Sequence, residues 1–513
     1  MGLAALASRA EAGAAINGGG EAIVGLYANI GSLDPHFQVS HIAASVFFGL
    51  YEGLVTVDED GRVIPSLAER WSSSPDGLAY RFDLRRGVRF HDGGEMTARD
   101  VVASLERYRR ISPERGLPDL IERVDASSPQ TVAIRLRKAS ATFLPRLASP
   151  ANPVAIIPAH EAPKPLNQTA NVGTGPFRLA EWTPDSQVRL RRFAGYSANT
   201  AFTGPQGLGG RRTAWLDTVT FRFMPEPSAR VAALEAGDIH LAEQVPARAA
   251  ARLARNPRLR IERLTDFNMP ALFINHARAP TSGLALRRAV QAAVDVREAM
   301  AGATDGAYTL DPSWLWPNSP YYSKAGGELY GLHDLNIARR WLAEARYRGE
   351  AIDFLIPNIS LHMKLGVILL EQLRTAGLNV RPVSVDFATM VATIASDRGW
   401  HLALNGFRAA PFLGPYAYET IFSGPNNWAR AKALEDGPMR MLWDRFNAAP
   451  DDKGRAAAWA AIQALTYRNV TMVKLGAENL LIGMDRRLQG YRPYAGGERM
   501  WDVRWSPAGR VPS

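Results

Sequence analysis

The sequence predicts an α/β protein with more than one domain. The clearest evidence lies between Glu350 and Phe407, where short apolar runs alternate with segments of helical period. This alternation indicates a βαβαβ unit with a mainly parallel sheet and right-handed crossovers. The chain has 513 residues, which is more than one hydrophobic core supports and corresponds to about three domains.

The βαβαβ unit brings polar and aromatic residues to one edge of its sheet. We expect strands at 351–356, 379–385 and 401–404, and helices at 363–376 and 387–395. Parallel sheets bind ligands beside the carboxyl ends of their strands. The residues that this rule selects are Asp386, Phe387, Asn405, Phe407 and Arg408.

Arg408 is the most specific of these candidates. A guanidinium at the carboxyl edge of a sheet can bind a carboxylate or a phosphate with two parallel hydrogen bonds. The competing explanation is an ordinary surface arginine, since the chain contains 60 lysines and arginines.

The stretch from Leu50 to Tyr108 is the most distinctive part of the chain. Alternation from Leu78 to Leu84 predicts a half-buried strand, and residues 88–90 resume the alternation as a second strand. Thr97 then caps a helix, because Asp100 lies three residues later in the capping-box position. From its residues alone, this stretch is a strand, strand, helix unit.

The order of motifs in this stretch resembles the family 5 extracytoplasmic solute-binding proteins, the peptide, opine and nickel receptors of ABC importers. The motifs are the run Tyr51–Leu54, the turn at 58–61, the hairpin end at 88–93 and the helix at 97–108. The resemblance implies a periplasmic-binding-protein-like fold, with two α/β lobes, a two-strand hinge and an extra inserted α+β domain. It also implies three units: lobe I at 20–45, 173–270 and 480–513, a middle domain at 46–172, and lobe II at 271–479.

The remaining elements follow from local patterns. Alternation and apolar runs predict strands at 23–28, 131–136, 219–223 and 238–242, a strand pair after Pro176, and crossing strands at 271–275 and 480–484. Helical periods and caps predict helices at 41–51, 228–237, 286–294, after Asp334, and at 454–467. Proline and glycine density predicts loops at 150–165 and 202–212.

Two loops next to the first lobe supply further candidate contacts. Gly173 and Thr174 lie in a turn that, by the resemblance, returns from the middle domain close to the ligand. A dinucleotide-binding loop is the alternative, but Pro176 and a strand follow where such a loop needs a helix. We add Asn29 and Phe37, which flank the turn after the first strand.

Aromatic residues gather in two predicted loops of lobe II. Trp314 and Trp316 lie in one loop, and Tyr416 and Trp428 follow the last strand of the βαβαβ unit. Aromatic walls with a few polar groups are typical of clefts that enclose an organic solute. Core packing is the competing explanation for each of these side chains.

The composition excludes several function classes. The chain has no cysteine, so disulfides, thiolate metal sites, cysteine nucleophiles and lipid-modified cysteines are excluded. No nucleophile elbow, P-loop or HExxH motif is present, and we expect neither a cofactor nor a resident metal. A net charge of +10 suggests nucleic acid as a partner. The arginines are scattered along the sequence, however, and form no basic stripe.

The resemblance implies a monomeric receptor that delivers a small organic solute to the membrane permease of an ABC importer. We expect it in a Gram-negative periplasm without a lipid anchor. No run of about 18 apolar residues is present, and the Ala-rich N-terminus fits either the end of a signal peptide or a tail.

One departure from the family's sequence pattern narrows the range of solutes that we expect. Peptide-binding relatives place an aspartate after the strand at 401–404 to pair with the peptide amine, whereas this chain reads FRAAP at 407–411. An unpaired buried amine costs several kcal/mol, so we expect an opine, a sugar conjugate or a modified peptide with anionic or hydroxylated groups. The alternatives are a general di/oligopeptide receptor, a nickel-chelate receptor and a hydrolase.

Overall fold

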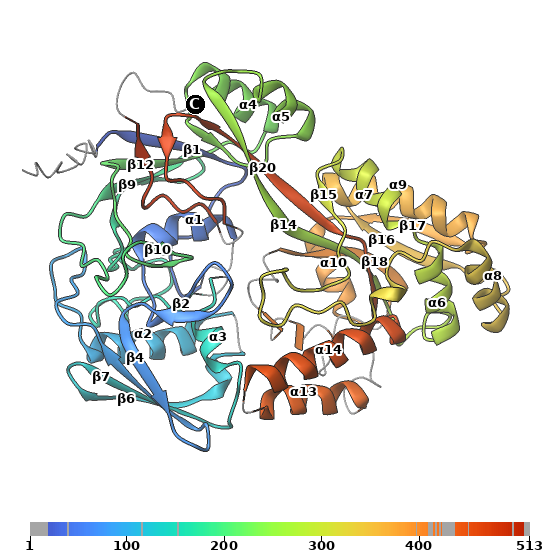
Figure 1. Cartoon of the computed structure of the whole chain (residues 1–513), viewed down its shortest axis with the longest axis horizontal. Coiled ribbons are helices and arrows are strands. Elements are labelled where there is room, and N and C mark those ends of the chain that lie inside the picture. The colour runs from blue at the N-terminus through green and yellow to red at the C-terminus, as the bar shows by residue number, and fades with distance from the viewer. Residues whose placement is uncertain are drawn as a thin grey trace, which may run out of the picture.

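The computed structural model describes residues 19–37, 41–113, 116–150, 153–396, 398–408, 414–415, 418–419, 422, 437–449, 451–494 and 497–506. Figure 1 shows two bodies on either side of a diagonal pair of strands, β14 (Leu259–Ile274) and β20 (Ala477–Asp485). The predicted α/β fold with two lobes, a two-strand hinge and an inserted domain is confirmed.

The diagonal strands β14 and β20 form the hinge. They pair antiparallel from Leu259 and Asp485 to Asn268 and Glu478, and β14 then continues into lobe II. There β14 pairs with β18 (Leu402–Arg408) and β19 (Met472–Lys474). Both crossing strands are longer than we predicted, because their outer ends pair within the lobes as well as across the hinge. One 12-stranded sheet therefore runs through the molecule.

Lobe I surrounds the parallel strands next to the hinge. In the sheet, β20 is followed by β13, β1, β12, β9 and β8, with β1 parallel to both β12 and β13. The elements are β1 Glu21–Leu26, β8 Phe177–Thr183, β9 Gln187–Arg192, β12 Thr218–Phe223, β13 Leu241–Ala242, α1 His41–Leu50, α4 Pro227–Ala236, α5 Ala247–Leu253, β21 Leu488–Gln489 and β22 Arg504–Trp505. Gly237 ends α4 in the left-handed conformation, as predicted.

The predicted loop at 202–212 contains a short hairpin, β10 Pro205–Gln206 and β11 Gly209–Gly210. The strand predicted at 238–242 is reduced to two residues, because β13 pairs with β1 only at Leu241 and Ala242.

The middle domain has a separate four-stranded antiparallel sheet in the order β4-β5-β7-β6, at the lower left of Figure 1. Its elements are β2 Val55–Val57, β3 Val63–Pro65, β4 Ala68–Ser73, β5 Ala79–Leu84, α2 Ala98–Ile111, η1 Pro118–Leu120, β6 Ile121–Ser128, β7 Thr131–Leu136 and α3 Phe143–Leu147.

The strand predicted at 88–90 is wrong. Arg89 forms only an isolated bridge with Glu95, because β5 already pairs with β4 on one side and with β7 on the other. Local alternation indicated that Val88 and Phe90 are buried, which is correct, but it could not show that both edges of β5 were occupied.

Lobe II contains the predicted βαβαβ unit. Strands β16 (Ile352–Pro357), β17 (Val380–Val385) and β18 are parallel, in the order β17-β16-β18. The helices between them are α9 Ser360–Thr375 and α10 Phe387–Ile394. The other elements are α6 Leu284–Ala293, α7 Val296–Thr304, β15 Tyr308–Thr309, η2 Gly327–Leu329, α8 Leu335–Glu344, α13 Pro438–Ala448 and α14 Asp452–Asn469.

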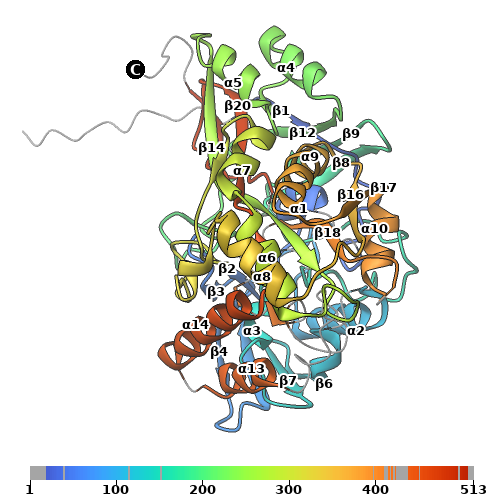
Figure 2. The ribbon, with the colours of Figure 1, turned by 90° about the vertical axis from the view of Figure 1, so that its right-hand side faces the viewer.

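Side-chain alternation separates the two faces of this sheet. Leu272 and Leu404 belong to one core with α6, α7, α8 and α9, whereas Phe273 and Phe407 belong to a second core with α10, α13 and α14. Strands buried on both faces read as continuous apolar runs, which is why residues 401–404 show no alternation. Figure 2 shows α6 to α9 on the side of lobe II that faces the viewer.

Lobe I and the middle domain share one hydrophobic core. Val24 of β1 and Phe82 of β5 lie in the same cluster of buried side chains. The proposed boundaries of the three units therefore stay a prediction. Among the described residues, no helix is both long enough and apolar enough to cross a membrane.

Asp100 joins the start of α2 to the proline-rich connection. Its carboxylate accepts hydrogen bonds from the backbone and hydroxyl of Thr97 and from the Ala159 amide at 2.8 Å. We expect Asp100→Ala to lower the free energy of unfolding by about 1–3 kcal/mol. Glu106→Ala, which removes an exposed i,i+3 pair on the same helix, should cost less than about 0.5 kcal/mol. Equal losses in urea unfolding of the two variants would contradict this role.

Candidate functional site

A buried ion pair holds the loop that follows β1. Arg107 of α2 donates to both carboxylate oxygens of Asp34, at 2.7 Å for Nη1 to Oδ1, and both side chains are inaccessible to solvent. The Asn167 amide also donates to Asp34. The pair ties the loop to the middle domain and leaves Phe37, three residues later, 40% exposed.

The pKa shifts around this pair have opposite physical causes. Burial alone would raise the pKa of Asp34, but the hydrogen bonds and charge of Arg107 together with two backbone amides lower it. Burial lowers the pKa of His36 to about 4, so His36 is neutral at ordinary pH. Its Nε2–H then donates to Ala155 O, and its Nδ1 accepts from Arg107.

The Gly173 turn passes so close to α1 that only glycine fits. A Cβ on Gly173 would lie 2.1 Å from the carbonyl oxygen of Leu50. The side chain of His91 holds the turn in place through two hydrogen bonds. Its Nδ1 accepts a hydrogen bond from the Gly173 amide, and its Nε2 donates one to Gly175 O. Thr174 is fully buried beside them, and its hydroxyl has no hydrogen-bond partner among the described residues.

A cavity of about 640 Å³ lies beside the hinge, between the two lobes. It contains the carboxyl ends of strands from both lobes, which is where α/β sheets bind ligands. We name it the hinge cavity, and its walls include Pro227, Gln244, Pro246, Asn268, Asp305, Ser360, Lys364, Phe387, Asn405, Gly406, Glu478 and Asn479.

A buried arginine shapes the lobe I wall of the hinge cavity. The guanidinium of Arg230 on α4 donates to the carbonyls of Pro225, Glu243 and Gln244 at 2.9, 3.0 and 3.3 Å. These carbonyls follow β12 and β13, so one side chain fixes the ends of two strands. Burial lowers the pKa of Arg230, and the charges of Glu243 and Glu226 oppose that shift.

The polar groups of the hinge cavity include amides and opposite charges. Asn268 donates to Glu478 at 3.2 Å across the two hinge strands, and Lys364 lies 3.6 Å from Asp305. Asn405 is 4% exposed in the middle of β18, whereas Phe387 is 45% exposed at the start of α10. Such a wall can hydrogen-bond a polar solute and cover its apolar part.

Of the aromatic residues predicted to contact the solute, some lie in the lobe II core and one lies at the interface between the lobes. Trp314 and Phe407 are buried in lobe II, with ring centroids 5.9 Å apart and in edge-to-face contact. Neither residue lines the hinge cavity. Trp316 lies in a lobe II loop, yet it packs against the core shared by lobe I and the middle domain. It is therefore a contact between the lobes.

The structure brings Phe387 and Asn405 together in the hinge cavity. Asn29 is exposed and donates to Asp185 at 2.9 Å. Tyr416 and Trp428 lie outside the described residues, and Arg408 is described only in its backbone, as the last residue of β18. The role of each predicted contact stays a prediction. Among the residues described, no three histidine, aspartate or glutamate side chains gather as a metal site.

Sequence reasoning missed Gln244, Asn268, Lys364 and Glu478 of the hinge cavity. Gln244 carries a local signal, because its neighbour Pro246 marks a turn after a strand. The polar residues inside the crossing strands show no such signal.

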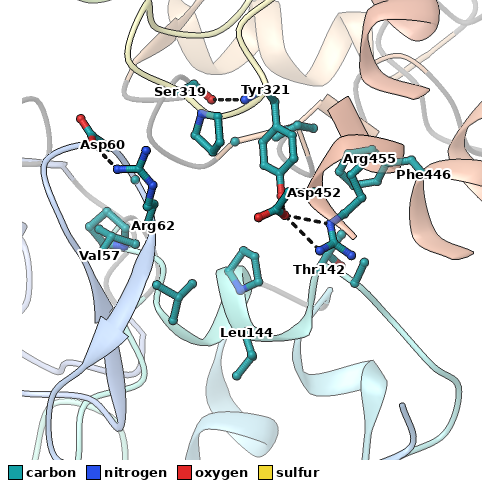
Figure 3. A pocket seen from close by; sticks show the side chains of 18 of the residues that line it. Val57, Asp60, Arg62, Thr142, Leu144, Ser319, Tyr321, Phe446, Asp452 and Arg455 are labelled. Carbon is teal, nitrogen blue, oxygen red and sulfur yellow. Dashed lines mark hydrogen bonds and ion pairs between the residues drawn. The ribbon is translucent and has the colours of Figure 1, made fainter. Parts of the chain in front are cut away.

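A second cavity, of about 450 Å³, lies between the middle domain and lobe II. Figure 3 shows Arg62 and Leu144 on one side of it and Tyr321, Asp452 and Arg455 on the other. It shares no lining residue with the hinge cavity.

We expect Gly173→Ala to destabilise the protein by about 1–3 kcal/mol, because the added methyl group would overlap the Leu50 carbonyl. Gly31→Ala is the matched control, since a Cβ there meets no atom within 4 Å. Thermal unfolding of both variants checks this expectation. A normal melting temperature for Gly173→Ala would show that the turn can move away from α1.

Asp34→Asn should lower the free energy of unfolding at pH 7 by about 3–5 kcal/mol, because it leaves the Arg107 charge buried and poorly paired. The lowered pKa of Asp34 means that its contribution is present above its ordinary value of 3.8 and is lost as pH falls below it. The variant should therefore lose less stability on acidification below pH 4 than the natural protein.

Asp444→Asn, in an exposed pair with Arg440, is the control for Asp34→Asn and should cost less than about 1 kcal/mol. Parallel acid titrations of the two variants with equal slopes would contradict the assignment to Asp34.

Comparison with known proteins agrees with this architecture. The family model described as "Bacterial extracellular solute-binding proteins, family 5 Middle" matches residues 62–429. The chain is 27% identical over 492 residues to the glutathione-binding protein GsiB of Salmonella choleraesuis (strain SC-B67), covering 92% of this chain and 91% of that protein.

Two solved structures share the fold over nearly the whole chain. NikA from Brucella suis, in complex with Fe(III)-EDTA, has a TM-score of 0.81 and 21% identity, covering 95% of this chain and 100% of that one. AgaA from A. tumefacien R10, in complex with agropinic acid, has a TM-score of 0.77 and 23% identity. The match covers 95% of this chain and 99% of that one. With a family model that spans well over half of its length, this protein belongs to the family 5 bacterial extracellular solute-binding proteins, the receptors of ABC importers.

Proposed function

We propose that the protein captures an organic solute with anionic or hydroxylated groups and delivers it to its importer by closure of the lobes. The solute class comprises opines, sugar conjugates and modified peptides. The observation that carries the proposal is the hinge cavity, to which both lobes contribute the carboxyl ends of their strands.

Lobe closure follows from the way the cavity is built. A solute that contacts Gln244 of lobe I and Asn405 of lobe II at once binds the closed state more tightly than the open state. Its differential affinity shifts the population of receptors toward the closed form. The rotation can be absorbed at the hinge, where the pairing of β14 and β20 is irregular between Leu264 and Asn268.

The solute class is supported by the residues that follow β18 and by two relatives. The chain has Phe407 and Arg408 at this edge and no aspartate before Pro411, so its sequence lacks the aspartate that peptide-binding relatives place there for a peptide amine. Glutathione and agropinic acid, named with GsiB and AgaA, are both anionic molecules.

The proposed partners are the small solute and the permease subunits of an ABC importer. We propose a monomer in a Gram-negative periplasm, without a lipid anchor, and the family of extracellular solute-binding proteins supports a location outside the cytoplasm. Binding without chemical conversion is supported by the relatives, which are named as binding proteins.

Mass spectrometry of the solute released from natively purified protein tests the solute class. We expect an acidic or polyhydroxylated molecule, recovered unchanged after incubation with the receptor. Release of only unmodified peptides with free amines would indicate the general peptide receptor instead. Breakdown of the solute during incubation would indicate a hydrolase.

Arg408→Ala should weaken binding of an anionic solute by about tenfold to a hundredfold, because it removes a charge-assisted hydrogen bond. Arg381→Ala is the matched control, since Arg381 is an exposed arginine on β17 of the same sheet. Titration calorimetry of agropinic acid and glutathione against the two variants makes the comparison. Unchanged affinity in Arg408→Ala would remove this residue from the site.

A further inference from the structure

The second cavity differs from the hinge cavity in its walls and its position. One wall comes from the β2–β3 hairpin, β4, β5 and α3 of the middle domain, and the other from the loop at 319–321, α13 and α14 of lobe II. It therefore lies where the two bodies meet away from the hinge, at the lower end of the molecule in Figure 1. Its volume of about 450 Å³ is within the range of small-molecule sites.

Both walls of the second cavity carry aromatic side chains. Trp71 and Tyr80 lie on the middle-domain side, and Tyr321 and Phe446 lie on the lobe II side. Trp71, Tyr80 and Tyr321 are partly exposed, so their rings can accept a further contact. Aromatic rings bind other flat rings through offset or edge-to-face contacts.

The charged groups of the cavity already neutralise one another. Arg62 pairs with Asp60 on the middle domain, and Arg455 donates to Asp452 at 3.0 Å on lobe II. Tyr321 OH also donates to Asp452 at 2.9 Å. Figure 3 shows both ion pairs facing the same space from opposite sides. A charged ligand would have to compete with these partners, whereas an uncharged ligand would not.

Charged groups lie on both walls of the second cavity and beside it. Burial alone would raise the pKa of Asp452, but Arg455, Tyr321 and the charge of Arg62 on the opposite wall lower it. Beside the cavity, Arg146 of α3 lies 3.9 Å from Glu419 of lobe II, and Asn447 of α13 donates to the same carboxylate at 3.3 Å. The cavity exists because the middle domain and lobe II are in contact.

We propose that the second cavity binds an uncharged aromatic group between the middle domain and lobe II. The bound ring contacts Trp71 and Tyr80 on one body and Tyr321 on the other. Because it touches both bodies, it stabilises the closed arrangement of the lobes in addition to any solute in the hinge cavity. This site does not depend on the identity of the transported solute.

N-acetyltyrosinamide, an uncharged aromatic probe, tests the proposal on the full-length protein by titration calorimetry. We expect saturable binding, with a smaller radius of gyration by X-ray scattering when the probe is bound. Trp71→Ala and Tyr321→Ala, which change opposite walls, should each weaken binding by about tenfold. Met441→Ala is the control, because Met441 lies on the same helix as Phe446 but is 65% exposed to solvent.

Because Trp71→Ala and Tyr321→Ala change opposite walls, the test can still be made if one of these variants is unstable. Circular dichroism melting identifies a misfolded variant, and the variant of the opposite wall then carries the comparison. Absence of probe binding to the natural protein, or equal affinity in all three variants, would overturn the second site. Neither result would affect the anionic solute recovered from the hinge cavity, so failure of this site and failure of the proposed function are distinguishable.

Discussion

The antiparallel pairing of β14 and β20 is the constraint on which the rest of the structure depends. These two strands belong to both lobes, so the chain must leave lobe I, build lobe II and return in register with itself. The register brings the ends of β13 and β18 to the same region, since β13 pairs with β20 and β18 pairs with β14. The hinge cavity is a consequence of this pairing.

Buried guanidinium groups fix the loops around the cleft. Arg107 binds Asp34 after β1, and Arg230 binds the carbonyls that follow β12 and β13. Each group loses its hydration on burial, and its hydrogen bonds offset that cost only if every partner keeps its position. We infer that these arginines specify the shape of the cleft more than they add to stability.

The cleft is bounded by contacts of different strength. At the hinge the two lobes share a continuous hydrogen-bonded sheet, whereas at the far end the middle domain meets lobe II around the second cavity and through the Arg146–Glu419 pair. The Arg146–Glu419 pair is partly exposed and 3.9 Å long, and a pair of this kind contributes little to stability. A receptor that opens and closes needs this asymmetry, because the hinge must persist while the far contact breaks.

Local patterns were sufficient to predict most helices and strands in this protein. The capping box of Thr97 and Asp100, the glycine end of α4 and the βαβαβ unit each depend on residues that are close in sequence. The strand predicted at 88–90 was wrong because strand pairing depends on distant segments. Phe387 could be selected as a lining residue, because it follows a strand of the parallel sheet. Asn405 also lines the cavity, but it lies inside β18, which continues to Arg408 beyond the predicted strand.

The sequence by itself therefore determined the family, the parallel sheet of lobe II and the edge at which its strands end. These features depend on the local hydrophobic period and on the order of motifs along the chain. Only the tertiary structure decided that Trp314 is core and Trp316 an interface residue, although the two lie in one loop. It also brought Gln244, Asn268 and Glu478 into one cavity. Residues so far apart in the chain meet only through the pairing of the crossing strands, and no local pattern records that pairing.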